Sequence, residues 1–154
     1  MPNTIQEFLM QDTRKAADEL VEAFLRLPEE KRNWSPAEKA RTALDQVAEC
    51  AILNGNTAEL IQTRIWQPGR YEEFLRKKAE MIAQGWGPIH VLLQENTRIV
   101  IAGIGDVSNE ELNVEVDMPW GKMGLAQIMV YPDWNMTYHL GQINYIASIL
   151  GCLP

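Results

Sequence analysis

Four long segments of the chain place apolar residues three or four positions apart, the spacing that gathers side chains on one face of an α-helix. In the first segment, residues 4–27, the repeat consists of Ile5, Leu9, Ala16, Leu20, Phe24 and Leu27. Thr4 and Glu7 have the spacing of a capping box, and Pro28 cannot continue a helix. Helices with such faces must bury them against one another, so the chain is predicted to be all-α.

A second helix is predicted to begin at Ser35. Ser35 is a favourable N-cap, Pro36 suits the first helical position, and Glu38 suits the third. The face of this helix carries small and aliphatic side chains, which are Ala40, Ala43, Leu44, Val47, Ala51 and Asn54. Side chains of this size predict a close helix–helix approach. The pattern stops at Gly55 and resumes over residues 57–65.

Glycine and proline clusters separate the next two segments. A turn at Gln67-Pro68-Gly69 precedes a charged amphipathic helix over residues 71–83, which ends at Gly85-Trp86-Gly87-Pro88. A core helix is then predicted from Pro88 to Ile104. Its β-branched run, residues 99–101, is also compatible with a strand, but no second strand of matching pattern follows.

The last part of the chain is predicted to be extended over residues 114–121 and helical over residues 122–150. Pro132 is predicted to interrupt this helix, and Gly151 suits its C-terminal cap. With the charged segment as a long crossover, the four core helices predict one all-α four-helix bundle, a single domain spanning residues 1–154.

Composition limits the partners and the compartment. Asp and Glu number 21 against 14 Lys and Arg, giving a net charge of −7. An acidic chain without a basic stripe makes few phosphate contacts, so we expect no nucleic-acid partner. No apolar run reaches the length of a membrane span, and the N-terminus lacks the pattern of a signal peptide. Two isolated cysteines, Cys50 and Cys152, fit a reducing cytoplasm, and Cys50 is interpreted as a packing residue.

The most distinctive segment is Tyr131–Ile146, which contains Asn135 and His139 four residues apart and then Gly141-Gln142-Ile143. It resembles the last helix of the DinB-like (damage-inducible) four-helix-bundle superfamily, in which two histidines four residues apart precede Gly-Gln-Ile. Pro119-Trp120-Gly121 also matches the pattern of that superfamily. The resemblance implies a DinB-like bundle over about residues 4–151. It also implies a divalent metal, such as Zn or Ni, held by three histidines.

This chain cannot supply three histidines, because it has two in total and His90 lies on another helix. His139 keeps the second position of the last helix, and Asn135 occupies the first. On the second helix, the resemblance places Gln46 at the histidine position, and an offset of three residues would use Glu49. The candidate metal positions of this degenerate triad are therefore His139, Asn135, Gln46 and Glu49.

Two arrangements of these residues remain open. His139 lies at the edge of the apolar stripe of the last helix, so it is predicted to face the bundle interior. It could bind a metal together with Glu49, since transition metals favour imidazole and carboxylate ligands over amides. Alternatively, Gln46 and Asn135 could hydrogen-bond His139 without an ion. Glu49 lies nearly opposite Val47 on the helical wheel, which favours a solvent-exposed charge.

These arrangements lead to two hypotheses for function. The first is a bundle that binds a small molecule or a partner, with a degenerate metal site and no tightly held metal. The alternative is a metal-dependent thiol transferase or hydrolase with a remodelled site around His139. The sequence assigns no catalytic residue and no cofactor. The five tryptophans lie near predicted helix ends, where they could line an apolar pocket or plug the ends of the bundle.

A homodimer is predicted from apolar residues that lie off the main stripe of the last helix, namely Tyr138, Tyr145 and Ile149. The small residues of the second helix were expected to add to this interface. In a monomer, the crossover segment 73–84 would have to cover these residues. The basic residues Arg70, Arg76, Lys77 and Lys78 are interpreted as a solvated helix face.

Overall fold

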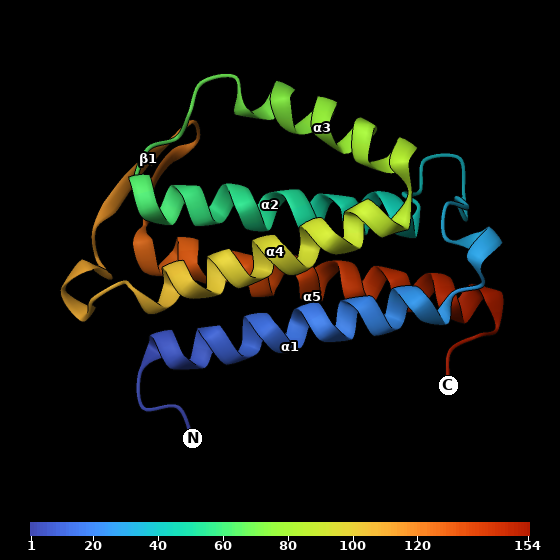
Figure 1. The fold of residues 1–154 in the computed structure, drawn as a ribbon, viewed down its shortest axis with the longest axis horizontal. Helices are drawn as coiled ribbons and strands as arrows, with labels where there is room; N and C mark the ends of the chain where they lie inside the picture. The colour runs from blue at the N-terminus through green and yellow to red at the C-terminus, as the bar shows by residue number, and fades with distance from the viewer.

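Four helices with apolar faces pack side by side, and a fifth lies against the outside of the bundle (Figure 1). The computed structural model describes residues 1–154. The helices are α1 (Ile5–Arg26), α2 (Ala43–Thr63), α3 (Arg70–Gln84), α4 (Trp86–Gly105) and α5 (Leu125–Leu150). Strands β1 (Glu115–Met118) and β2 (Gly121–Gly124) form a hairpin, and 3-10 turns occur at Glu29–Lys31 and Asn109–Glu111. The predicted all-α bundle is confirmed.

The crossover helix α3 determines the order of the bundle. Helices α1 and α5 run in one direction, and α2 and α4 run in the other (Figure 1). Because α3 carries the chain back along the outside of α2, α4 can lie parallel to α2. Helix α2 consequently has α4, α5 and α3 as neighbours. None of the helices is both long enough and apolar enough to cross a lipid bilayer.

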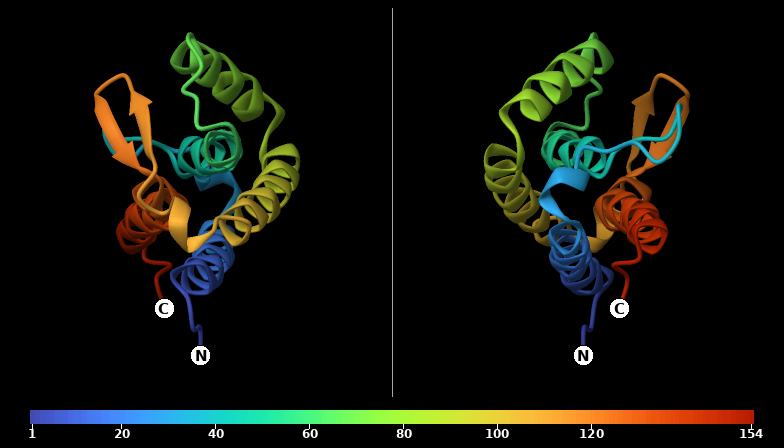
Figure 2. Two further views of the ribbon diagram at one scale, coloured as in Figure 1. Left: turned by 90° about the vertical axis from the view of Figure 1, so that its left-hand side faces the viewer. Right: turned by 90° about the vertical axis from the view of Figure 1, so that its right-hand side faces the viewer.

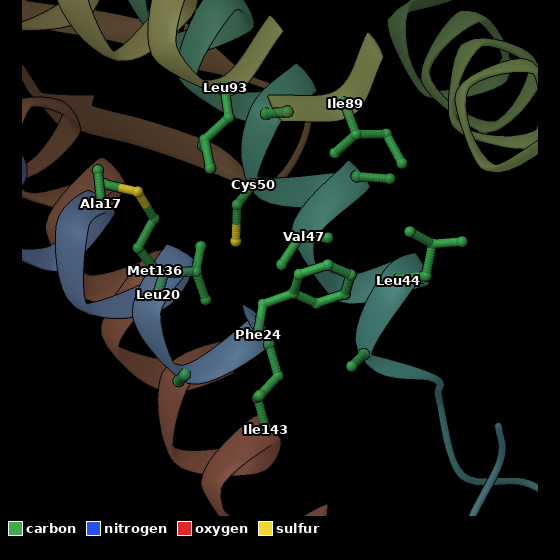
Figure 3. Close-up of a cluster of buried hydrophobic side chains, with 14 of the residues drawn as sticks. Ala17, Leu20, Phe24, Leu44, Val47, Cys50, Ile89, Leu93, Met136 and Ile143 are labelled. Atoms are coloured by element: carbon green, nitrogen blue, oxygen red, sulfur yellow. The ribbon is translucent and has the colours of Figure 1, made fainter. Parts of the chain in front are cut away.

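The core of the bundle consists of two apolar clusters. One surrounds Phe24 and includes Val47, Cys50, Met136 and Ile143 (Figure 3). The other includes Leu9, Ile61, Val100, Leu125 and Met129. Burying a large apolar side chain contributes roughly 1.5–3 kcal/mol. The interpretation of Cys50 as a packing residue is confirmed, since its thiol is buried and burial raises its pKa.

The predicted start of α2 at Ser35 is wrong. The helix begins at Ala43, where the Thr42 hydroxyl accepts a hydrogen bond from the Asp45 N–H at 3.1 Å. The Ser35 hydroxyl instead lies within hydrogen-bonding distance of the carbonyls of Ala37 and Ala40, in the loop before the helix. Ser35 and Thr42 are both capping residues followed three positions later by an acidic residue, Glu38 and Asp45 respectively. The backbone bond from Leu44 N–H to Arg32 carbonyl, at 2.8 Å, ties the start of the helix to the α1–α2 loop.

Helix α2 is continuous through Gly55, where the sequence predicted a break. A Cβ atom added at Gly55 would lie 2.6 Å from the side-chain nitrogen of Asn96, which donates to the Ala51 carbonyl at 2.8 Å. The glycine therefore permits close contact between α2 and α4, and the helix does not end there.

Residues 115–118 are extended, as predicted, but they pair with a second strand that the sequence did not predict. Val116 lies opposite Met123, and Gly121 has a positive φ of 126° at the turn. Lys122 is therefore in β2, and α5 begins at Leu125. Pro132 lies within α5 without interrupting it. The hairpin and α3 both project on the side of α2 that faces away from the core (Figure 2).

Candidate ligand-binding groove and the Glu49–His139 network

A groove of about 950 Å³ lies between α3 and the β1–β2 hairpin, with α2 and the start of α5 as its floor. Apolar and aromatic side chains make up most of its walls, among them Leu53, Trp66, Phe74, Leu75, Trp120 and Met123. The rings of Trp66 and Trp120 meet edge to face, with centroids 5.2 Å apart. A concave apolar surface with a few polar groups is the usual form of a small-molecule site.

Arg41, Glu49 and Lys78 line one end of the groove, and Asp45 pairs with two of them. Arg41 contacts both Asp45 and Glu49, with its Nη2 2.6 Å from Glu49 Oε2. Lys78 of α3 lies 2.9 Å from an Asp45 oxygen and 3.9 Å from Glu49 Oε2. These ion pairs attach α3 to α2, and they are only partly exposed. We call Arg41, Asp45, Glu49 and Lys78 the charged cluster.

Glu49 also faces the bundle interior, where its Oε1 lies 3.0 Å from His139 Nε2. Only 15% of its side chain is exposed, so the predicted solvent-exposed charge is wrong. The direction opposite Val47 does not point to solvent in this fold, because α2 has helices packed around it. Glu49 therefore connects His139 of α5 to the charged cluster.

The predicted interior position of His139 is confirmed, because 1% of the residue is exposed. Its Nδ1 lies 2.8 Å from Gln46 and 3.2 Å from Gln142. Asn135 is also buried but makes no hydrogen bond to His139. Its amide instead points at Cys50, with a nitrogen–sulfur distance of 3.7 Å. Gln46 and Glu49 thus converge on His139, and Asn135 does not.

Both ring nitrogens of His139 are engaged by protein groups. A carboxylate can only accept a hydrogen bond, so Nε2 must carry a proton and donate it to Glu49. Nδ1 lies between the amides of Gln46 and Gln142. Since the ring is buried and each nitrogen has a partner, His139 holds Glu49 in place and presents no free nitrogen to the groove.

The environment of Glu49 stabilises its charged form. Burial by itself would raise its pKa, but the hydrogen bond from His139 and the charge of Arg41 outweigh burial and lower the pKa to about 2. Glu49 is therefore an ionised carboxylate at neutral pH.

Comparison with solved structures finds a crystal structure of a DinB-like protein, YjoA from Bacillus subtilis. The two structures agree with a TM-score of 0.67, over 93% of this chain and 92% of that chain. The chain has a DinB-like fold. The sequence identity is 14%, so the likeness concerns the fold alone. No protein-family model matches the chain, and no curated protein matches it.

The donor set at the expected metal position of this DinB-like fold is a poor fit to a divalent cation. No three His, Cys, Asp or Glu side chains lie together in a way that could hold a metal ion. The Nε2 of His139 faces Glu49, and the second oxygen of Glu49 faces Arg41 and Lys78. A divalent ion would have to displace these contacts and lie beside two cationic side chains.

Several residues of the groove were missed or misjudged from the sequence. Arg70 is 7% exposed and pairs with Glu59 at 2.9 Å. Lys78 belongs to the charged cluster. The prediction that these two residues belong to a solvated helix face is therefore wrong. Trp66 and Trp120 line the groove, as one interpretation of the tryptophans expected. The sequence places Arg41, Asp45 and Glu49 four residues apart, and this spacing could have predicted their pairing.

We expect Glu49→Gln to lower the free energy of unfolding by about 1–3 kcal/mol at neutral pH, because a charged hydrogen-bond partner is lost. The pKa of Glu49 is depressed in the fold, so its contribution is complete above about pH 4.5 and is lost as the pH falls toward 2. Urea unfolding across this range should show the wild type and the variant converging at low pH. Glu73→Gln, at an exposed and unpaired position of α3, is the control. A constant difference at every pH would contradict the assignment.

Proposed function

We propose that this protein binds a small apolar molecule in the groove and does so without a metal ion. The observation that carries the proposal is the groove itself, a mostly apolar concavity of about 950 Å³ that Arg41, Glu49 and Lys78 of the charged cluster also line. A volume in this range is typical of small-molecule sites. His139, Gln46 and Glu49 then serve as a buried hydrogen-bond network beneath the ligand, and Asn135 packs beside Cys50.

The network is suited to support rather than catalysis. A general base needs a free nitrogen or oxygen within reach of the substrate, and both nitrogens of His139 are engaged. Cys50 is buried and its thiol has a raised pKa, so it is a poor nucleophile. The alternative function, a metal-dependent thiol transferase or hydrolase, would require His139 to leave Glu49 and ligate an ion.

We also propose that the protein forms a homodimer through α5. Its exposed apolar residues are Val130, Trp134, Tyr138, Tyr145 and Ile149, and they follow one stripe along the whole helix. We call this the α5 stripe. Every exposed position of α5 is uncharged, whereas surface helices ordinarily carry charges on their outer face. Apolar and aromatic surface depleted of charge is characteristic of interface cores.

Gly141 lies in the middle of the α5 stripe and supports the same proposal. A Cβ atom added there would meet nothing within 4 Å, so the monomer does not require glycine at this position. A glycine inside a helix costs roughly 0.5–1 kcal/mol relative to alanine. An absent side chain here lets a second α5 approach closely. The small residues of α2 are buried within the monomer and do not add to this surface. Helix α3 lies on α2 and α4, so it does not cover the stripe.

The groove predicts saturable binding of the neutral fluorophore N-phenyl-1-naphthylamine. Leu75→Glu places a charge in the apolar wall and should weaken this binding about tenfold or more, since 1.4 kcal/mol is a factor of ten. Leu25→Glu is the matched control, because Leu25 of α1 is 45% exposed against 43% for Leu75 and lies outside the groove. Fluorescence titration measures both. Equal weakening by the two variants would place the binding site elsewhere.

Titration calorimetry with Zn²⁺ and Ni²⁺ tests the proposal that the site near His139 holds no metal ion. The wild type should show no stoichiometric binding, and a chelator should leave its thermal stability unchanged. The double variant Gln46→His/Asn135→His should bind either ion more tightly, because it supplies two more imidazoles around His139. Tight binding by the wild type, with loss of stability on chelation, would refute the proposal.

Light scattering at micromolar concentration should give twice the monomer mass of 17.5 kDa. Tyr145→Glu should produce the monomer, while Val91→Glu, at a residue of α4 that is 67% exposed, should not. Gly141→Leu should also dissociate the dimer without lowering monomer stability, because its side chain meets open space in the monomer. A wild type that scatters as a monomer across this range would exclude the interface.

A further inference from the structure

At the polar end of the groove, the groups that still lack a hydrogen-bond partner are donors. Arg41 uses Nε for Asp45 and Nη2 for Glu49, and its Nη1 has no protein partner. Lys78 has three N–H groups and lies within hydrogen-bonding distance of one oxygen, on Asp45. Its separation of 3.9 Å from Glu49 is too long for a second hydrogen bond.

Tyr131 adds a third donor. Its side chain lines the groove, and its hydroxyl makes no hydrogen bond to the protein. Burial, followed by the charge of Glu49, raises the pKa of Tyr131 to about 12. The phenol therefore keeps its proton at neutral pH and can donate it.

The acceptors of the charged cluster are already in use. One oxygen of Glu49 accepts from His139 and the other from Arg41. The two oxygens of Asp45 accept from Arg41 and Lys78. A ligand group placed beside Arg41, Lys78 and Tyr131 therefore meets spare donors and few spare acceptors.

We propose, on the basis of the ligand-binding function above, that the groove selects a carboxylic acid with an apolar body. The carboxylate accepts hydrogen bonds from Arg41 Nη1, Lys78 and the Tyr131 hydroxyl. The body lies against the aromatic wall that includes Trp66 and Trp120. The planar carboxylate matches the fork of an arginine side chain.

The charged cluster is electrically neutral, which limits the charge that a ligand can bring. Two cations and two anions of the charged cluster cancel, so spare donors and not net charge hold the ligand. A phosphate dianion would bring a second charge into a largely apolar groove, where an uncompensated charge is costly. A quaternary ammonium head group has no hydrogen-bond acceptor, so it cannot use the spare donors of Arg41, Lys78 and Tyr131.

Displacement of bound N-phenyl-1-naphthylamine by three ligands with the same ten-carbon chain tests this selection. Decanoate should displace the fluorophore at about one-tenth of the concentration required for decanol, equivalent to 1.4 kcal/mol. Decyltrimethylammonium should be weaker than decanol. Decanol that competes as well as decanoate would overturn the head-group assignment and leave the ligand-binding function standing. Failure of the fluorophore itself to bind would instead refute that function.

Variants at the donor end give a second test. Lys78→Gln and Tyr131→Phe should each reduce the advantage of decanoate over decanol, while the affinity for decanol stays the same. Lys77→Gln is the matched control, because Lys77 is the adjacent lysine of α3 and does not line the groove. Lys78→Arg should retain the preference if the positive donor matters. If Lys78→Gln weakens decanoate and decanol equally, the lysine acts by holding α3 in place, and the proposed contact is wrong.

Discussion

The carboxylate of Glu49 holds together the parts of the molecule that form the groove. One of its oxygens accepts from His139 of α5, and the other faces Arg41 and Lys78. Glu49 therefore connects α2 to α5 directly, and together with Asp45 it connects α2 to the α3 wall. Such a charge is tolerated only where its partners surround it, since an isolated carboxylate in a dry environment is strongly disfavoured. His139 serves Glu49 in turn, because Gln46 and Gln142 fix the orientation of its ring.

In this DinB-like fold, the positive charge beside Glu49 comes from side chains. A metal ion would place positive charge between α2 and α5, and here positive charge comes from Arg41 and Lys78 instead. Side-chain cations are directional, since their N–H groups point at particular oxygens. Both side chains also line the groove. An ion enclosed by three imidazoles would not reach it. Arg41 and Lys78 thus pair with Asp45 and Glu49 and also line one end of the groove.

The sequence predicted well which face of α5 points to the interior and predicted poorly which residues of α2 are exposed. The difference has a physical reason. His139 could be placed inside because it lies at the edge of the apolar stripe of Met136 and Ile143, which is buried in the core. Glu49 could not, because α2 has neighbours around it and an angle on a helical wheel does not predict exposure there. The start of α2 was missed because Ser35 and Thr42 both resemble N-caps, and a tertiary bond from Leu44 to Arg32 distinguishes them. The groove depends on the placement of α3 and the hairpin, which no local pattern specifies.

The two walls of the groove, α3 and the hairpin, are the elements least involved in the core. Helix α3 has one buried residue, Arg70, and the hairpin contributes Val116 to the core while Trp120 stays 65% exposed. The apolar clusters can therefore keep the bundle folded while the groove walls change, because loss of a wall contact does not open a cavity in the core. Under the proposed function, the charged cluster and the aromatic walls would therefore determine which ligand binds. The bundle supplies the fixed distance between α2 and α5 across which Glu49 and His139 meet.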